Sequence, residues 1–250
     1  MMQGRVFTPG FIILSLAALG ALVILLTLGS WQVQRLQWKE ALIERVETRI
    51  ASDPVDVSSL GDDVEGLRGG ENDLEYRPLN VSGAFDHTHE FHYYATLDGA
   101  PGYHIYSPLS LSEPKGKIAL VNRGFIPVDK KDVSTRPESL TKGTVAFTGL
   151  FRWPDDKKPN SFTPDNDVES NILFWRDRDL MISEAGLEEA NVLPFFIYVD
   201  KADNPSLPIG GVSIISFANN HLQYAITWFG LALTLIGVYG GLLISRMRAR

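Results

Sequence analysis

Two long uncharged apolar stretches lie near the two ends of this 250-residue chain, and they constrain its fold more than any other feature. No residue between Val6 and Gln34 is charged, and Tyr224 to Ile244 is uncharged as well. About 20 apolar residues in a helix cross the roughly 30 Å hydrocarbon core of a bilayer. The sequence therefore predicts two transmembrane helices, at residues 10–31 and 222–244.

Each stretch has a second interpretation. The first could be a cleaved signal peptide, because Ala17, Ala18 and Ala21 are small, but the apolar run is longer than a signal core and only Arg5 precedes it. We therefore favour a retained anchor. The second contains a G-x-x-x-G pattern at Gly237 that could let another helix approach closely, although glycines are common in membrane helices in any case.

The distribution of charge predicts the orientation. Two spans place the tails, residues 1–9 and 245–250, on the same side, and the arginines of the second tail indicate that this side is the cytoplasm. Basic residues just after the first span compete, but long segments are translocated largely regardless of their charge. We expect a two-pass protein of the inner (plasma) membrane, with residues 32–221 outside the cytoplasm, which in a Gram-negative bacterium means the periplasm.

The expected fold class is a membrane protein with two transmembrane α-helices bracketing a mainly antiparallel β (α+β) domain. Residues 33–50 have the periodicity of an amphipathic helix, and the acidic stretch 52–75 reads as a loop. Short runs typical of strands follow at 79–85, 91–97, 103–111, 118–128, 144–153, 195–200 and 212–217, with a short helix at 177–186 and an irregular loop at 153–167. Strands of this kind suggest a sandwich or a barrel.

Composition excludes several functions. Four of the 23 Lys and Arg residues lie in the tails, so the segment between the apolar stretches holds 19 basic residues against all 30 acidic ones. An acidic domain repels phosphate backbones, so nucleic acid is not an expected partner. The chain has no Cys, which excludes disulfides, thiolate metal sites and a Cys nucleophile. Because no motif of a known catalytic site is present either, we do not expect an enzyme.

His221 is the leading candidate for a functional side chain. It lies where the second apolar stretch begins, and a neutral imidazole at the edge of a bilayer can ligate haem iron. Tyr224 and Trp228 follow at spacings of three and four, so a helix would place them on the same face, where they could flank a flat ligand. The alternative is a histidine that only anchors the helix by hydrogen bonds at headgroup depth.

Other polar residues invite weaker interpretations. His87, His89 and His92 could suggest a metal carrier, but on a strand the first two would face away from the third, so a solvated strand end is favoured. His104, at the start of a strand, reads as structural. The guanidinium of Arg123 could bind a carboxylate such as a haem propionate, although such an arginine more often pairs with an acidic neighbour.

Motifs along nearly the whole chain resemble the Surfeit locus protein family of assembly factors for haem–copper terminal oxidases. The matching residues are Gly29, Trp31-Gln32, Arg35, Trp38-Lys39, Leu42-Ile43, Glu75-Tyr76-Arg77-Pro78, Gly83, Phe85, Glu90, Pro101-Gly102-Tyr103-His104, Pro108-Leu109, Asn122-Arg123-Gly124, Pro127, Phe162, Pro164, Asn171, Trp175, Pro208, Gly210-Gly211, Asn219 to Ala225, and Thr227-Trp228-Phe229. Phe125 departs from the pattern, because the family usually has Trp after the Arg-Gly pair.

The resemblance implies a role in maturing cytochrome c oxidase at the step where haem a reaches the catalytic subunit. Bacterial members are thought to bind haem a, with the histidine at the start of the second span as the proposed iron ligand, and His221 matches that position. The implied partners are oxidase subunit I, haem a synthase and the lipid bilayer, and the family is not regarded as enzymatic. The alternative is a membrane-anchored scaffold that stabilises an oxidase assembly intermediate without binding haem.

Overall fold

A computed structural model describes residues 8–61, 64–70, 73–201, 206–212 and 219–248. The chain divides into two compact units, each described by itself. The helical unit comprises Met1–Arg45 and Ser216–Arg250, and the sheet unit comprises Val46–Ile215. The fold class predicted from the sequence is confirmed, since two long apolar helices flank a domain built on a β-sheet.

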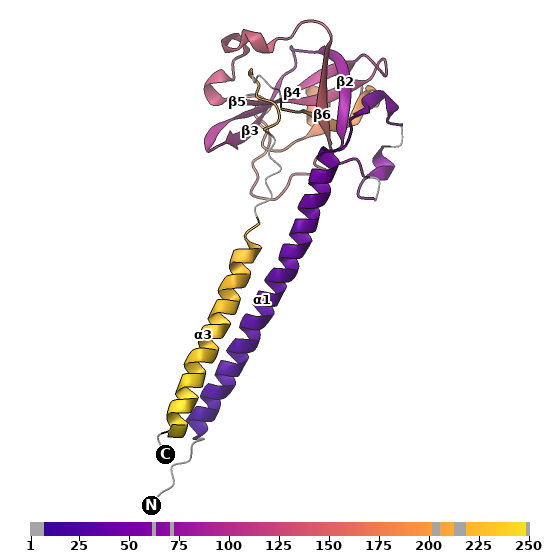
Figure 1. The fold of residues 1–250 in the computed structure, drawn as a ribbon. Helices are drawn as coiled ribbons and strands as arrows, with labels where there is room; N and C mark the ends of the chain where they lie inside the picture. The colour runs from indigo at the N-terminus through magenta and orange to yellow at the C-terminus, as the bar shows by residue number, and fades with distance from the viewer. Residues whose placement is uncertain (1–7, 62–63, 71–72, 202–205, 213–218, 249–250) are drawn as a thin grey trace, which may run out of the picture. The chain divides into compact units, whose positions relative to one another are not determined.

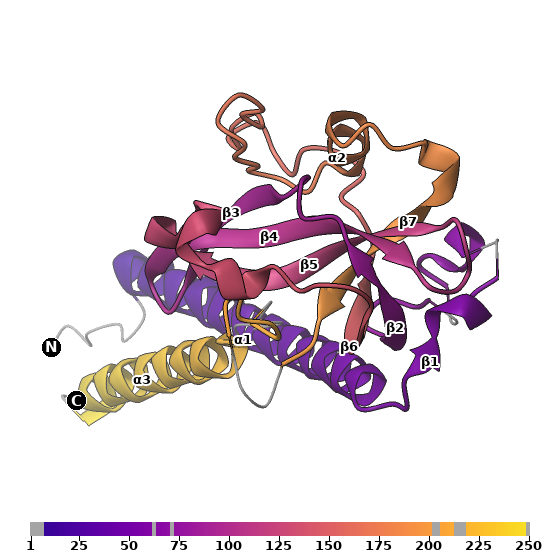
Figure 2. The same cartoon turned by 90° about the horizontal axis from the view of Figure 1, so that it is seen from above.

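The helical unit holds α1 (Pro9–Ile50) as far as Arg45 and α3 (His221–Arg248), and these two helices lie side by side (Figures 1 and 2). Both are long and apolar enough to cross a membrane. Their apolar side chains point outward, with Ile13 68% and Leu233 71% exposed. Water would oppose so large an exposed apolar surface, whereas lipid accommodates it. α1 continues without a break through the range in which we expected a span and then an amphipathic helix, and α3 already includes His221.

The sheet unit contains one seven-stranded sheet. Its strands are β1 (Val55–Asp56), β2 (Pro78–Phe85), β3 (Phe91–Leu97), β4 (Ala100–Leu111), β5 (Ile118–Pro127), β6 (Val145–Arg152) and β7 (Val192–Val199). The order is β1-β2-β6-β7-β5-β4-β3, and only the β1–β2 and β5–β7 pairs are parallel. A short additional pairing of β2 with β4 closes five of the strands into a ring. Partly open five-stranded barrels of this size include the OB fold, but a barrel by itself assigns no function.

The core lies inside this ring. The inward faces of β2, β4, β6 and β7 carry side chains that are completely buried, among them Leu79, Leu109, Phe151 and Ile197. The rings of Phe151 and Phe195 stack with centroids 4.1 Å apart. A second cluster packs α2 (Arg178–Glu184) against the sheet, and the carboxylate of Asp177 caps this helix by accepting from the Leu180 N–H at 3.0 Å.

Six of the seven predicted strand ranges coincide with β2 to β7 within a few residues, and the predicted short helix is α2. Residues 213–217 of the seventh predicted range lie outside the described residues. The 52–75 stretch, predicted as a loop, contains the two-residue strand β1 and two short 3-10 helices, Val57–Ser59 and Glu65–Leu67. β1 is too short to show the alternation on which strand prediction depends.

Candidate functional site

His221 lies in the first turn of α3 and contacts α1 through one ring nitrogen. Its Nδ1 is 2.7 Å from Oε1 of Gln32, a side chain that is only 9% exposed. Because an amide oxygen can only accept, Nδ1 carries the proton and donates it. Among the described residues, no hydrogen bond reaches Nε2 of His221. The nitrogen with a free lone pair is therefore available to a ligand from outside the chain.

Tyr224 and Trp228 extend the same helix beyond His221, at the spacing that the sequence predicted. Tyr224 is 54% exposed, and Trp228 is half-buried. An apolar, aromatic surface thus continues from the imidazole toward the middle of α3. Nothing in this surface is charged, so a flat apolar ligand would meet no acidic or basic side chain from these residues. Their contact with a ligand stays a prediction.

Gln32 was not predicted from the sequence as a contact of His221, although it lies within one of the family motifs. The two residues are 189 positions apart, and no spacing rule links them. One feature of the sequence could have indicated a contact: Gln32 is a polar residue at the end of an apolar stretch. Polar side chains in such helices usually form hydrogen bonds with a neighbouring helix. Asn219 lies near the same helix start, and its buried Oδ1 has no hydrogen-bond partner within the part of the chain that is described.

Gly29 sets the distance between α1 and α3 beside this pair. A Cβ added to Gly29 would lie 2.8 Å from Cε1 of Phe229, which is closer than real Cβ atoms approach. By contrast, a Cβ added to Gly237 or Gly241 would meet nothing within 4 Å. The close approach of the two helices therefore uses Gly29 and not the G-x-x-x-G pattern noticed in the sequence.

Arg123 belongs to a buried cluster of charges in the sheet unit. Its side chain is 6% exposed and lies 3.7 Å from Glu90, which also pairs with the fully buried guanidinium of Arg136. Arg123 donates in addition to the Ser139 carbonyl. The structure thus shows the pairing with an acidic neighbour that the sequence analysis considered more usual, and a ligand role for Arg123 has no support from this geometry.

The pKa of Glu90 reflects this cluster. Burial alone would raise it, but hydrogen bonds from His92 and Arg136, together with the positive charge of Arg136, lower it to about 2. Burial lowers the pKa of Arg123 to about 10, and the nearby charge of Glu90 only partly opposes this. Glu90 is therefore the shared counter-ion of two buried arginines, which is a structural arrangement.

The other histidines do not converge. His87 and His89 lie in the turn between β2 and β3, where Nε2 of His87 is 2.8 Å from the Thr141 carbonyl and Nδ1 of His89 is 2.6 Å from Asp86. His92 is buried on β3, with Nε2 3.3 Å from Glu90. Within the described residues there is no group of three His, Cys, Asp or Glu that could hold a metal ion. The predicted solvated strand end fits His87 and His89, which are partly exposed, but it is wrong for His92, which is buried on β3.

The Asn-Arg-Gly motif has a backbone role. Asn122 Oδ1 accepts from the Gly124 N–H at 2.9 Å, and Gly124 has a φ of +124°, which favours glycine. A Cβ on Gly124 would lie 2.2 Å from the Ile209 carbonyl oxygen. The motif therefore bends β5 where a second segment of backbone pairs with Phe125.

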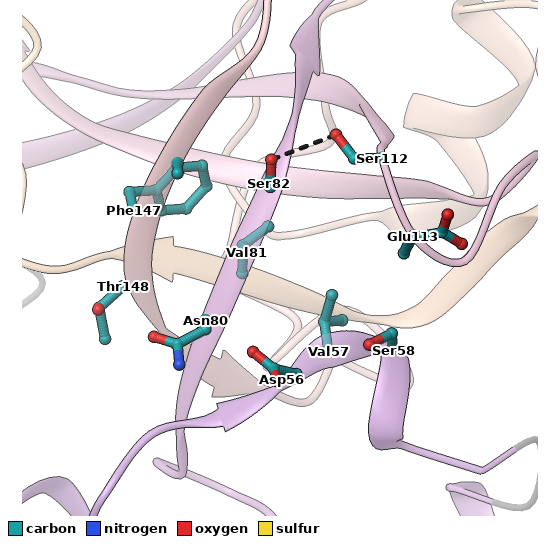
Figure 3. A pocket seen from close by; sticks show the side chains of 11 residues that line it. Asp56, Val57, Ser58, Asn80, Val81, Ser82, Ser112, Glu113, Phe147 and Thr148 are labelled. Carbon is teal, nitrogen blue, oxygen red and sulfur yellow. Dashed lines mark hydrogen bonds between the residues drawn. The ribbon is translucent and has the colours of Figure 1, made fainter.

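An open pocket of about 530 Å³ lies beside β2 (Figure 3). Hydroxyl and carboxylate groups surround an apolar floor, and the hydroxyls of Ser82 and Ser112 are 3.2 Å apart. The described lining contains none of the candidate residues from the sequence. Nothing in its chemistry singles out a reaction or a ligand.

Comparison with known proteins places the chain in a family. The family model described as the SURF1 family matches residues 19–233. Surfeit locus protein 1 of Rattus norvegicus is 34% identical over 220 residues, which cover 82% of this chain and 67% of the relative. The Homo sapiens protein of the same name is 33% identical over 222 residues, with 82% and 69% covered, and a SURF1-like protein of Drosophila melanogaster is 29% identical over 226 residues, also with 82% and 69% covered. The chain belongs to the SURF1 family.

Proposed function

We propose that this chain is a membrane-anchored assembly factor for a haem–copper terminal oxidase, which binds haem a through His221 and aids its insertion into subunit I. The observation that carries this proposal is the imidazole at the start of α3, whose Nδ1 is fixed by Gln32 while Nε2 is open. Neutral imidazole nitrogen is a common axial ligand of haem iron. Haem a is the cargo here, and the chain's part is to hold and release it.

The surroundings of His221 suit a porphyrin. Tyr224 is 54% exposed and Trp228 is half-buried on the face of α3 that includes His221, so an apolar macrocycle would be covered on one side by these rings. His221 would be the chain's single ligand to the iron, so only one coordination bond would have to break when the haem passes to a receiving protein. The chain itself needs no catalytic group for such a transfer, which accords with a non-enzymatic role.

The orientation predicted for the chain in the membrane also determines where the haem would bind. With α1 and α3 crossing the inner membrane and the acidic sheet unit on the periplasmic side, the start of α3 would lie at the outer surface of the bilayer. Subunit I is the receiving partner in this proposal, and haem a synthase is the source.

Binding of haem a to the purified full chain in detergent tests the proposal. The wild-type protein is expected to show a haem absorption band with one haem per chain, and His221→Ala to lose it. His89→Ala is the matched control, because it removes an imidazole of the sheet unit and is expected to leave the band unchanged. Equal haem binding by all three proteins would show that His221 is not the iron ligand.

The same variants distinguish the proposed haem-binding role from the alternative of a scaffold that binds no haem. In the host, His221→Ala is expected to lower the haem a content of assembled oxidase, whereas His89→Ala leaves it at the wild-type level. If His221→Ala supports full oxidase assembly, the chain acts only by tethering an intermediate.

A further inference from the structure

We propose that Gln32 is the positioning residue of His221: it fixes the imidazole with the proton on Nδ1 and thereby presents Nε2 to iron. This inference rests on the haem-binding function proposed above and adds a residue on the other helix to that site. Its geometric basis is the 2.7 Å contact between Nδ1 of His221 and Oε1 of Gln32.

The contact determines which nitrogen can coordinate. A neutral imidazole has one protonated nitrogen and one with a free lone pair, and only the second can bind a metal. Since the Gln32 oxygen accepts from Nδ1, the lone pair is on Nε2. Histidines that bind metals usually donate their other N–H to an oxygen, and this second contact orients the ring and strengthens the ligand.

The burial of Gln32 supports a specific role. A primary amide in an apolar helix is costly to desolvate unless it is hydrogen-bonded, and Gln32 is 9% exposed. Gln34, two residues further along α1, is exposed. The buried glutamine therefore faces α3, and the exposed one provides a control with the same side chain.

The packing of the two helices keeps the contact in place. Gly29 lies one turn before Gln32 on α1 and lets the Phe229 ring approach, while Phe229 lies about two turns after His221 on α3. The contact and the close approach therefore lie on the same faces of the helices. Such an arrangement restricts the imidazole before any ligand arrives, which is the condition for pre-organisation.

A merely structural role is the competing explanation. A hydrogen bond between helices also stabilises their association. The experiment must therefore measure properties of the bound iron in addition to the amount of folded protein.

The test uses the full chain in detergent and titrates it with purified haem a. Gln32→Leu removes the acceptor, Gln32→Glu keeps an acceptor in the same place, and Gln34→Leu makes the matched change on the exposed face. The dissociation constant and the reduction potential of the iron are measured for each. In the haem-free proteins labelled with ¹⁵N-histidine, NMR at a pH where the ring is neutral reports which nitrogen of His221 carries the proton.

We expect Gln32→Leu to weaken haem binding roughly 10- to 100-fold, as for other contacts to metal-binding histidines. Gln34→Leu should bind as the wild type does. Gln32→Glu should retain binding and lower the reduction potential, because a carboxylate makes the imidazole a stronger donor to ferric iron. The proton of His221 should be on Nδ1 in the wild type and no longer held there in Gln32→Leu.

Two results would overturn the inference. One is a dissociation constant for Gln32→Leu equal to that of Gln34→Leu, and the other is equal weakening by Gln32→Leu and Gln32→Glu with no change in potential. A wild-type protein that binds no haem a would instead contradict the proposed function itself. The two failures are thus told apart by the wild-type titration.

Discussion

At the scale of single residues, two polar groups of this chain use their atoms differently, since one is bonded entirely within the fold and the other leaves an atom open. Glu90 belongs to the first kind, since both of its neighbouring arginines use its carboxylate. His221 belongs to the second, because one nitrogen is bonded and the other is available. A group whose bonds are all satisfied inside the chain has little left for a ligand, and this difference separates His221 from Glu90. An open nitrogen is not sufficient by itself, because Nδ1 of the buried His92 also lacks a hydrogen-bond partner among the described residues.

His104 gives a prediction about pH at this scale. It lies on β4 between the rings of Tyr93 and Phe125, and burial lowers its pKa to about 4, with a hydrogen bond to Asn122 opposing the shift. The unfolded chain takes up this proton near pH 6.5. The stability that the neutral ring provides is therefore complete above about pH 6.5 and is lost as the pH falls to about 4.

The free energy of unfolding of the sheet unit should fall by about 2 kcal/mol between pH 7 and pH 5 because of His104. Urea unfolding of the full chain, followed by tryptophan fluorescence, measures it. Glu90 and Asp86, whose pKa values lie at about 2, reduce stability only below about pH 4.5 and do not interfere. His104→Gln should remove most of the loss, and an unchanged pH dependence in this variant would contradict the assignment.

At the scale of elements, the pairing of α1 with α3 depends on a glycine and not on a pattern of large side chains. Gly29→Leu would force the Phe229 ring away, since even a Cβ would be 2.8 Å from it. Gly20→Leu is the control on the same helix, because a Cβ there meets nothing within 4 Å. We expect only the first change to separate the helices.

Chemical crosslinking measures this separation. The chain has no Cys, so Ser15→Cys and Tyr239→Cys can be introduced as a unique pair where the native hydroxyls are 2.5 Å apart. A short bis-maleimide reagent should join the pair efficiently in the parent and in Gly20→Leu, and poorly in Gly29→Leu. Equal crosslinking in all three would show that the contact at Gly29 does not hold the helices together.

Elements were predictable from the sequence where they carry a local pattern. The alternation in β3 and the apolar length of α3 sufficed to find both. The closure of the ring by β2 and β4 was not predictable, because both strands were predicted but neither pattern indicates which distant strand will pair with it over three residues. The contact of Gln32 with His221 was hidden for the same reason: local periodicity says nothing about which distant residue a polar side chain will meet.

At the scale of the whole molecule, charge is separated along the chain. All 30 acidic residues lie between the two apolar stretches, while Arg246 and Arg248 end α3. Basic residues next to a membrane span favour the cytoplasmic side, and a long acidic segment does not oppose translocation. The proposed delivery of haem a outside the cytoplasm requires this orientation.

Single cysteines test the orientation, since the native chain contributes none. Lys115→Cys places a thiol on the exposed turn between β4 and β5, and Met247→Cys places one near the end of α3, where the native side chain is 52% exposed. In right-side-out membrane vesicles, a maleimide that cannot cross the bilayer should label Lys115→Cys at once. It should label Met247→Cys only after detergent is added, because that thiol would face the interior. The reverse pattern would place the sheet unit in the cytoplasm and would move the start of α3, with His221, to the side opposite to the proposed transfer.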